Sequence, residues 1–241
     1  MNPKDWVICI ISKIKAESQD TVALRIQLPE NESINFMPGQ YIMFGFLDGE
    51  ESNRTKAFSI SSPPLSQGWV EVTVKREGPF STRMTKLQVD DKVKIRGPIG
   101  HFVFKDEYKQ DLVMIAGGTG LAPIMSMIRY IANKNLPNKV KLLYSTRSPE
   151  HILYKEDLEI LNDQGNVKVV LTMTRLQETD KWDDYKGRVD RKMLEENIED
   201  FSNSLFFVCG PDKMVDDMMK ILREMGAKIG QIKVEKWGIV G

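Results

Sequence analysis

The stretch that decides the fold is residues 115–123, Ile-Ala-Gly-Gly-Thr-Gly-Leu-Ala-Pro. It follows an apolar run, Leu112–Ala116, and precedes a segment of helical periodicity, Ala122–Asn133. Glycines let a ligand approach the backbone closely, and the first turn of a helix offers unpaired N–H groups to an anion. Pro123 suits that turn, since its missing N–H breaks no hydrogen bond. The stretch therefore indicates a phosphate-binding junction. Its spacing is G-x-G-x-x-P, whereas the full dinucleotide-binding fingerprint is G-x-G-x-x-G. The alternative interpretation is therefore a tight structural turn that binds no phosphate.

The chain from residue 111 onward alternates apolar strand candidates with helical stretches. We expect strands at Leu112–Ala116, Val140–Tyr144, Val167–Leu171, Leu205–Cys209 and Gln231–Glu235. We expect helices at Ala122–Asn133, Tyr154–Leu161, Arg191–Asn197 and Asp212–Met225. This alternation predicts a parallel sheet with helices on both faces.

The chain before residue 105 reads instead as short strands separated by turns. Strands are expected at Trp6–Lys15, Thr21–Leu28, Tyr41–Phe46, Lys56–Ser61, Val70–Lys75 and Lys92–Arg96, and one short helix at Ser81–Leu87. Strands at such short spacing suggest a small antiparallel β-barrel. With the polar segment Lys105–Gln110 as the link, the sequence predicts a barrel domain at 1–106 and an α/β domain at 107–241.

Composition excludes several classes of function. The 241 residues are 41% hydrophobic and carry 34 basic and 34 acidic side chains, a balance that argues against nucleic-acid binding. The apolar run Trp6–Ile11 is too short for a signal or membrane segment. With two cysteines and two histidines, a metal centre is not expected. We expect a cytoplasmic, reduced protein without metal.

The ends of later strands in the second half also carry candidate binding residues. Ser145-Thr146-Arg147-Ser148 offers hydroxyls and a guanidinium where many NAD-binding folds place an acidic residue, and Arg175 follows the next strand. These groups suit a 2′-phosphate and favour NADPH over NADH. The alternative is that Arg147 and Arg175 are solvated charges on loops and bind no ligand. Cys209-Gly210-Pro211 ends a further strand, and Cys209 could face a ligand crevice or simply be a small buried side chain.

Taken in order along the chain, the motifs resemble those of the ferredoxin–NADP reductase superfamily. Lys56–Ser62 resembles its R-x-[YF]-[ST] flavin motif, and Gly78–Ser81 resembles its G-x-x-S phosphate turn. Gly97–Phe102 is similar to its G-P-x-G-x-F segment. Gly117–Pro123 and Cys209–Pro211 are similar to its two nucleotide-side motifs. The resemblance covers essentially the whole chain.

This resemblance implies a flavin-binding barrel followed by a pyridine-nucleotide domain. It implies hydride transfer from NAD(P)H to FAD, with FMN as the less favoured flavin, and delivery of electrons to a ferredoxin, a flavodoxin or an oxygenase component. Phe58 would lie against the flavin ring, Ser59 would bond near its N5 atom, Cys209 would help to position the reacting atoms, and Trp237 would cover the ring or pack on the last strand. The implied cofactor-binding residues are Arg54, Lys56, Phe58, Ser59, Ile60, Val74, Lys75, Gly78, Phe80, Ser81, Thr82, Gly118, Thr119, Gly120, Pro123, Ser145, Arg147, Arg175, Cys209, Gly210 and Pro211.

The chain departs from the family where Lys56 replaces the motif arginine, because lysine lacks the bidentate guanidinium fork. Arg54, expected on the same face of the same strand, is the candidate substitute. Two other readings stay open. The chain could be an electron-transfer subunit of a larger enzyme, although subunits of the dihydroorotate dehydrogenase kind carry a C-terminal cysteine-bound cluster and no cysteine follows Cys209 here. It could also be a non-catalytic interaction module that keeps the fold.

Overall fold

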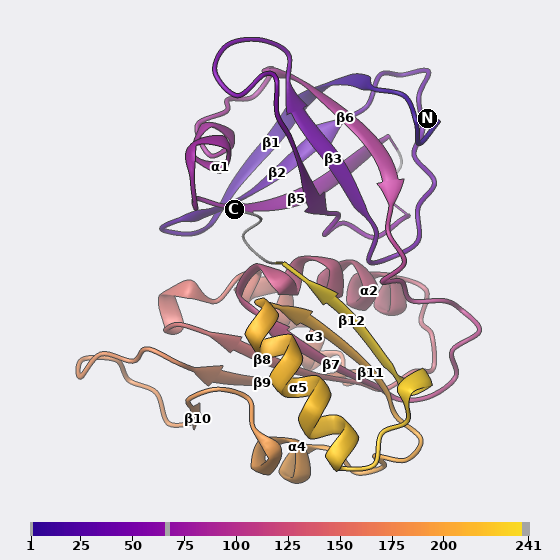
Figure 1. Cartoon of the computed structure of the whole chain (residues 1–241), viewed down its shortest axis with the longest axis vertical. Helices are drawn as coiled ribbons and strands as arrows, with labels where there is room; N and C mark the ends of the chain where they lie inside the picture. The colour runs from indigo at the N-terminus through magenta and orange to yellow at the C-terminus, as the bar shows by residue number, and fades with distance from the viewer. Residues whose placement is uncertain (1, 66–67, 238–241) are drawn as a thin grey trace. The chain divides into compact units, whose positions relative to one another are not determined.

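The computed structural model describes residues 2–65 and 68–237. Contacts divide the chain into two compact units (Figure 1). The first unit holds the residues up to Lys105 together with Met125–Tyr130, and the second holds Asp106–Ile124 and the chain from Ile131 onward. A short stretch of one helix is therefore packed into the first unit, although the residues on either side of it belong to the second.

The first unit is an antiparallel six-stranded sheet in the order β4-β3-β6-β1-β2-β5. Its strands are β1 (Val7–Ser18), β2 (Thr21–Gln27), β3 (Tyr41–Phe46), β4 (Thr55–Ser59), β5 (Trp69–Lys75) and β6 (Lys92–Ile99), and its short helix is α1 (Pro79–Met84). An isolated antiparallel bridge from Ile60 to Val72 joins the two ends of the sheet. The predicted antiparallel barrel is confirmed.

Alternating side chains build the interior of this barrel. Val70, Val72 and Val74 on β5 are fully buried, while Trp69, Glu71 and Lys75 are half-buried; Thr73 is buried as well. The rings of Phe44 and Phe80 pack edge to face, with centroids 6.2 Å apart. Large aromatic rings in such contacts contribute much of the core of a small barrel.

The second unit is a parallel six-stranded sheet in the order β10-β9-β8-β7-β11-β12. Its strands are β7 (Leu112–Gly117), β8 (Val140–Thr146), β9 (Val167–Met173), β10 (Tyr185–Lys186), β11 (Leu205–Gly210) and β12 (Ile232–Lys236). Its helices are α2 (Leu121–Asn133), α3 (Lys155–Asp163), α4 (Arg191–Asn197) and α5 (Asp212–Glu224), with 3₁₀ turns at Gly118–Gly120, Pro149–His151 and Ile229–Gln231. The predicted parallel sheet is confirmed.

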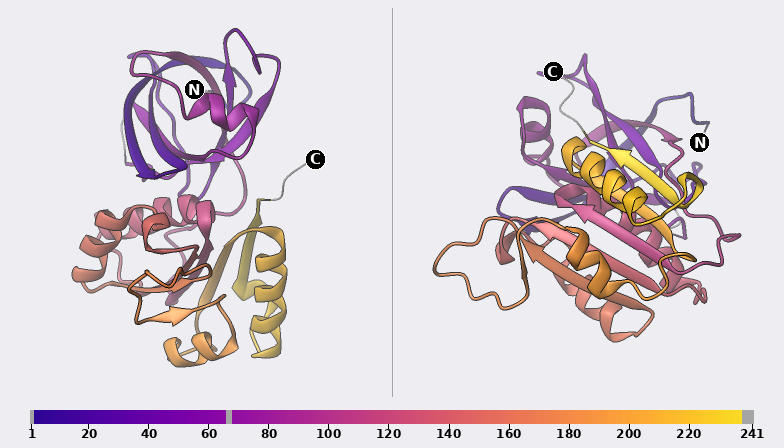
Figure 2. Two further views of the ribbon diagram at one scale, coloured as in Figure 1. Left: turned by 90° about the vertical axis from the view of Figure 1, so that its left-hand side faces the viewer. Right: turned by 60° about the horizontal axis from the view of Figure 1, so that its bottom comes forward.

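Helices cover both faces of this parallel sheet. Buried residues of α4 and α5, among them Leu194 and Val215, form one core with Ile115 and Val208 of the sheet. Helix α3 lies on the opposite face (Figure 2). Every residue of β7 and of β11 is buried, because a central parallel strand is covered on both sides.

A few elements differ from the sequence-based expectation. Helix α1 begins at Pro79 rather than Ser81, since the fixed φ of proline suits the first helical position. Strand β10 is only two residues long, Tyr185–Lys186, and too short to show as a hydrophobic run.

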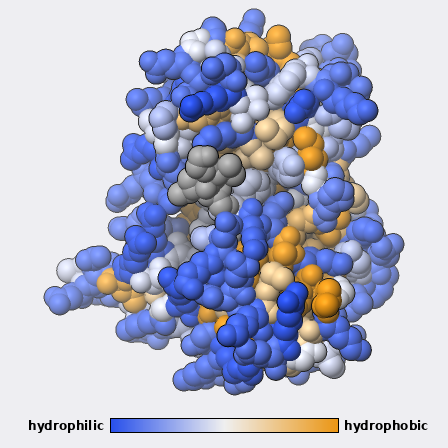
Figure 3. All heavy atoms as spheres, in the orientation of Figure 1, coloured by the Kyte–Doolittle hydropathy of each residue, from blue (hydrophilic) through white to orange (hydrophobic). Residues whose placement is uncertain are grey.

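Among the described residues, no helix is long and apolar enough to cross a membrane. The face shown in Figure 3 is mostly hydrophilic, with scattered apolar residues.

Candidate functional site

The second unit has a topological switch point at the carboxyl ends of β7 and β11. From β7 the chain moves to β8, β9 and β10 on one side of the sheet, and β11 and β12 lie on the other side. Crevices at such points are where open α/β sheets bind ligands. The turn Gly118–Gly120 follows β7, and β11 ends at Gly210, directly before Pro211, so both predicted nucleotide motifs meet there.

Two glycines of the first turn have different physical requirements. A Cβ on Gly120 would stand 2.4 Å from the Cys209 carbonyl oxygen, so the two turns touch through their backbones and no side chain fits between them. Gly118 has a positive φ of 54°, and a Cβ there would meet nothing within 4 Å. The backbone beside Gly118 is therefore open to a ligand. Thr119 is half-buried, and Pro123 is the third residue of α2.

The ends of β8 and β9 lie at the same edge of the sheet. Ser145 is in register with Gly117 on the neighbouring strand. The Arg175 amide donates to the Arg147 carbonyl over 2.8 Å, and this bond joins the loops that follow β8 and β9. The Arg175 side chain is exposed and Arg147 is half-buried. The structure thus joins, through the backbone, the two loops that carry the arginines singled out from the sequence.

The end of β11 carries a buried thiol beside a carboxylate. Cys209 is fully buried and pairs in register with Glu235 on β12. Burial, and then the charge of Glu235, raise the pKa of the Cys209 thiol well above its usual value, while a hydrogen bond from the Trp237 side chain lowers it. The Trp237 amide also donates to the Gly210 carbonyl over 3.2 Å. Cys209 and Trp237, both singled out from the sequence, are therefore brought together here.

Sequence reasoning missed Glu235 as a member of this group. The parallel pairing of β11 with β12 creates the contact, and a residue's position in a strand does not reveal its partner across the sheet. The nearest signal in the sequence was the neighbouring Trp237.

In the first unit, the last residue of β4 carries a buried hydroxyl. Ser59 is 6% exposed, and its Oγ has no hydrogen-bond partner among the described residues. A buried unsatisfied hydroxyl is costly, so it suits a site that a ligand completes. The ring of half-buried Phe58 lies nearly parallel to that of Phe80, with centroids 6.4 Å apart. These residues fit a flat, polar-edged group such as a flavin ring.

Three of the expected flavin residues point into the barrel. The side chains of Ile60, Val74 and Phe80 belong to the barrel core, so only their backbone atoms could contact a cofactor. The exposed Lys56 places its Nζ 5.8 Å from the Phe80 ring centroid.

The turn at Gly78 is held by Ser81. The Ser81 Oγ accepts a hydrogen bond from the Glu77 amide over 2.9 Å and donates to the Gly78 carbonyl over 3.3 Å. With its hydroxyl committed to this turn, Ser81 shapes the start of α1, where free N–H groups favour an anion. Lys75 and the half-buried Thr82 lie on either side of the turn.

The expectation for Arg54 is wrong in one respect. Arg54 lies one residue before β4 rather than on the strand, and its guanidinium pairs with Glu51 at 3.3 Å. The chain turns at residues 51–53, so the strand begins only at Thr55. Arg54 therefore does not share a strand face with Lys56.

Comparison with known families matches both units. The FAD-binding domain of oxidoreductases matches residues 8–104, and the NAD-binding domain of oxidoreductases matches residues 114–220. The chain belongs to the ferredoxin–NADP reductase superfamily. It is an FAD- and NAD(P)-binding oxidoreductase, and its cofactors are FAD and a nicotinamide nucleotide.

Several characterised relatives of this reductase resemble it along most of its length. An NADH-cytochrome b5 reductase 1 of Eremothecium gossypii is 28% identical over 92% of this chain and 80% of its own. A glycine betaine monooxygenase reductase subunit of Chromohalobacter salexigens is 28% identical over 98% of this chain, which spans 65% of that protein's length. The sulfhydrogenase 1 subunit gamma of Pyrococcus furiosus is 28% identical over 87% of this chain and 71% of its own.

The fold of this reductase also matches solved structures. The FAD/NAD-binding domain of a nitric oxide dioxygenase from Vibrio cholerae superposes with a TM-score of 0.86 over 98% of this chain and 100% of that one, at 22% identity. At that identity the likeness shows the fold alone.

Proposed function

We propose that this reductase prefers NADPH and delivers its electrons to a separate protein, such as a ferredoxin, a flavodoxin or an oxygenase component. The observation that carries the preference is the joined pair of loops bearing Arg147 and Arg175 at the carboxyl ends of β8 and β9. Guanidinium groups bind phosphates strongly, and residues 145–148 hold no carboxylate that would repel a 2′-phosphate.

The proposed roles of the chain's own residues follow from their environments. The open backbone beside Gly118 would receive the nucleotide pyrophosphate, and the first turn of α2 would supply N–H groups to it. The Ser59 hydroxyl donates to, or accepts from, the flavin near its reacting nitrogen, which satisfies the buried Oγ. The backbone at Gly78–Thr82 receives the flavin phosphates, with Lys56 as a supporting charge. When bound, the two cofactors supply the hydride-transfer chemistry.

The group at the end of β11 has a proton-holding role in this proposal. The Cys209 thiol is protonated at neutral pH, and its raised pKa extends that neutral state to alkaline pH, so the buried end of β11 carries no charge beside the nucleotide turn. Burial and the charge of Glu235 both favour the neutral thiol, and the Trp237 side chain, which lies beside it, would cover the ring.

The identity of the acceptor as a separate protein rests on the relatives. The glycine betaine monooxygenase relative is named as a reductase subunit, and so serves another protein.

The nucleotide preference is tested by rapid mixing of the FAD-loaded protein with NADPH or NADH under anaerobic conditions. We expect faster flavin reduction at low concentrations of NADPH than of NADH. We also expect Arg175→Gln to weaken NADPH about tenfold and leave NADH unchanged, because one charged hydrogen bond to phosphate is lost. Arg191→Gln removes an exposed arginine that is bonded to Glu224 and serves as the matched control. Faster reduction by NADH in the wild type would contradict the preference.

A second candidate function is an electron-transfer subunit of a larger enzyme, favoured by the similarity to the sulfhydrogenase gamma subunit. Purification of the tagged chain from its native cells separates the two. A stoichiometric redox subunit that stays bound through gel filtration supports the second candidate, while a free flavoprotein supports the first.

A further inference from the structure

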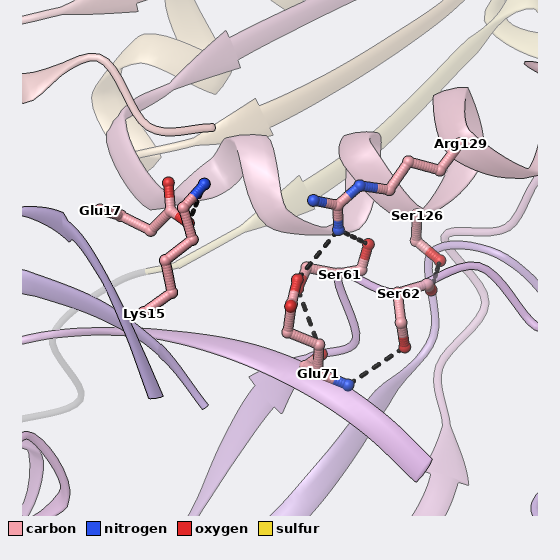
Figure 4. A network of polar contacts seen from close by, with 7 residues as sticks. All are labelled: Lys15, Glu17, Ser61, Ser62, Glu71, Ser126 and Arg129. Atoms are coloured by element: carbon pink, nitrogen blue, oxygen red, sulfur yellow. Dashed lines mark hydrogen bonds and ion pairs between the residues drawn. The ribbon is translucent and has the colours of Figure 1, made fainter. Parts of the chain in front are cut away.

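Helix α2, which follows the nucleotide turn, is hydrogen-bonded to the loop residues Ser61 and Ser62, which lie just after Ser59. Helix α2 begins at Leu121, directly after Gly118–Gly120, and its residues Met125–Tyr130 are packed into the first unit. Ser126 and Arg129 lie three residues apart, and therefore on one face of the helix. Figure 4 shows both side chains directed at Ser61 and Ser62.

Two bonds from this face hold the backbone of the segment. The Ser126 Oγ donates to the Ser62 carbonyl over 2.6 Å, and Arg129 Nη1 donates to the Ser61 carbonyl over 2.9 Å. Ser61, Ser62 and Ser126 are almost completely buried, so these bonds are shielded from water. Ser61 and Ser62 follow two and three residues after Ser59, whose Oγ has no partner among the described residues.

Glu71 on β5 completes the network. Its Oε1 lies 2.9 Å from Arg129 Nη1 and accepts from the Ser61 Oγ over another 2.9 Å. Its amide donates to the Ser62 Oγ over 3.1 Å. The Arg129 and Glu71 side chains are 19% and 17% exposed, so both charges are largely withdrawn from water.

Such a network is expected to add little to the free energy of unfolding. A largely buried ion pair loses much of its Coulombic gain to desolvation, and its better-attested use is to fix one geometry. Here the geometry fixed is that of the segment next to Ser59, and the element that fixes it is the helix that begins at the nucleotide turn. From Leu121 to Arg129 that helix spans about 12 Å as one rigid rod.

We propose that Ser126 and Arg129 are positioning residues that couple nucleotide binding at the start of α2 to the flavin-binding segment Ser59–Ser62. A nucleotide that orders the start of α2 also orders Ser126 and Arg129, and these hold Ser61 and Ser62 in place. Bound nucleotide therefore slows the release of FAD. The inference rests on the binding of FAD and nucleotide, and is independent of the proposed acceptor and of the preference for NADPH.

The test follows FAD release from the holoenzyme after dilution, by the fluorescence of free FAD, without nucleotide and with saturating NADP⁺ or NAD⁺. The oxidised nucleotides leave the flavin oxidised, and the visible difference spectrum reports that they are bound. We expect nucleotide to slow release about fivefold in the wild type, at the low end of typical coupling between sites. In Arg129→Met and in Glu71→Gln, we expect the ratio of the FAD release rate without nucleotide to the rate with nucleotide to fall to about one.

Lys134→Met is the matched control, since Lys134 lies just beyond the same helix and forms a more exposed ion pair with Asp106 at 3.1 Å. It should keep the wild-type ratio. A variant that is merely loosened releases FAD faster with and without nucleotide and also keeps the ratio. If Arg129→Met does not retain FAD, Ser126→Ala and Arg129→Lys take its place. We expect a reduced ratio of release rates in Ser126→Ala. In Arg129→Lys we expect a ratio between one and the wild-type value.

An equal ratio in the wild type and in Arg129→Met, or no slowing in a wild type that shows the nucleotide-induced spectral change, would overturn the coupling. A wild type that holds FAD but shows no spectral change with either nucleotide would contradict nucleotide binding itself, and the coupling with it. The Arg129→Met/Glu71→Gln double variant should lose no more than either single variant, because both act on one interaction.

Discussion

Gly120 and Cys209 touch through their backbones: a Cβ on Gly120 would stand 2.4 Å from the Cys209 carbonyl oxygen and 2.6 Å from its carbonyl carbon. The turns after β7 and β11 are therefore built against each other. The family's two nucleotide motifs, far apart in sequence, form one structure at the switch point of the sheet.

Replacement of Gly120 by alanine should separate these turns. The backbone must shift, at a cost of about 1–3 kcal/mol as for other overpacked sites, and the nucleotide cradle opens. We expect weaker nucleotide binding, measured by the flavin difference spectrum, while FAD is retained. Gly230→Ala is the control, since a Cβ there meets nothing within 4 Å. Unchanged nucleotide affinity in Gly120→Ala would show that the contact is not part of the binding site.

Replacement of Ser59 by alanine should affect flavin reduction more than flavin binding. The buried Oγ lacks a partner among the described residues, and the proposed role assigns it to the reacting edge of the flavin. We expect reduction by NADPH to slow about tenfold, which corresponds to about 1.4 kcal/mol in the barrier. Stopped-flow absorbance gives the rate, and FAD fluorescence gives the affinity. Ser202→Ala, which removes an exposed hydroxyl bonded to Asp200, is the control. Equal reduction rates in Ser59→Ala and the wild type would remove Ser59 from the mechanism.

The ionisation of Cys209 should respond in opposite directions to its two neighbours. Glu235 raises the pKa of the Cys209 thiol, so Glu235→Gln should lower that pKa toward its ordinary value. The hydrogen bond from Trp237 lowers the same pKa, so Trp237→Phe should raise it further. The chemical shift of the ¹³C-labelled Cβ of Cys209, followed against pH, reports each change. A shift in the same direction for both variants would be inconsistent with the arrangement at the end of β11.

Stability at alkaline pH should depend on Cys9. Burial, and then the charge of Glu32, raise the pKa of the Cys9 thiol from 9.0 to about 12. Below pH 9 the thiol is protonated in both the folded and the unfolded chain, and its contribution to stability is complete. Between pH 9 and about 12 it ionises only in the unfolded chain, so stability falls by about 1.4 kcal/mol per pH unit.

Urea unfolding of the wild type and of Cys9→Ala at a series of pH values measures this contribution. Lysines and tyrosines titrate equally in both proteins, so the difference between their free energies of unfolding isolates Cys9. We expect the advantage of the wild type to shrink as the pH rises above 9. A difference that stayed constant up to pH 11 would mean that the thiol ionises in the folded chain as readily as in the unfolded one.

The sequence predicted most reliably those elements whose signals are local. Helix α4 was predicted with its observed bounds, Arg191–Asn197. In the structure Asp190 caps this helix and accepts from the Met193 amide over 2.9 Å, so the start of the helix is set by a neighbouring residue. Strand β3 was likewise predicted at Tyr41–Phe46. Both glycine turns, Gly117–Pro123 and Cys209–Pro211, could be predicted because glycine and proline are the residues that such strand-to-helix junctions need.

The features that the sequence did not reveal depend on pairing between distant elements. Glu235 meets Cys209 only because β12 adds beside β11 in parallel register. Arg129 meets Glu71 only because one stretch of α2 packs into the first unit, and as a lone arginine in an amphipathic helix it resembles a solvated charge. Arg54 was misplaced because the start of β4 is set by its ladder to β3, where Thr55 pairs with Gly45.

The central claim is tested most directly by anaerobic mixing of the FAD-loaded protein with NADPH, and separately with NADH, while the visible absorbance of the flavin is followed. We expect rapid bleaching, faster with NADPH, and return of the absorbance when a protein electron acceptor is added. Absence of bleaching with either nucleotide would contradict the claim that this chain takes a hydride from a nicotinamide nucleotide.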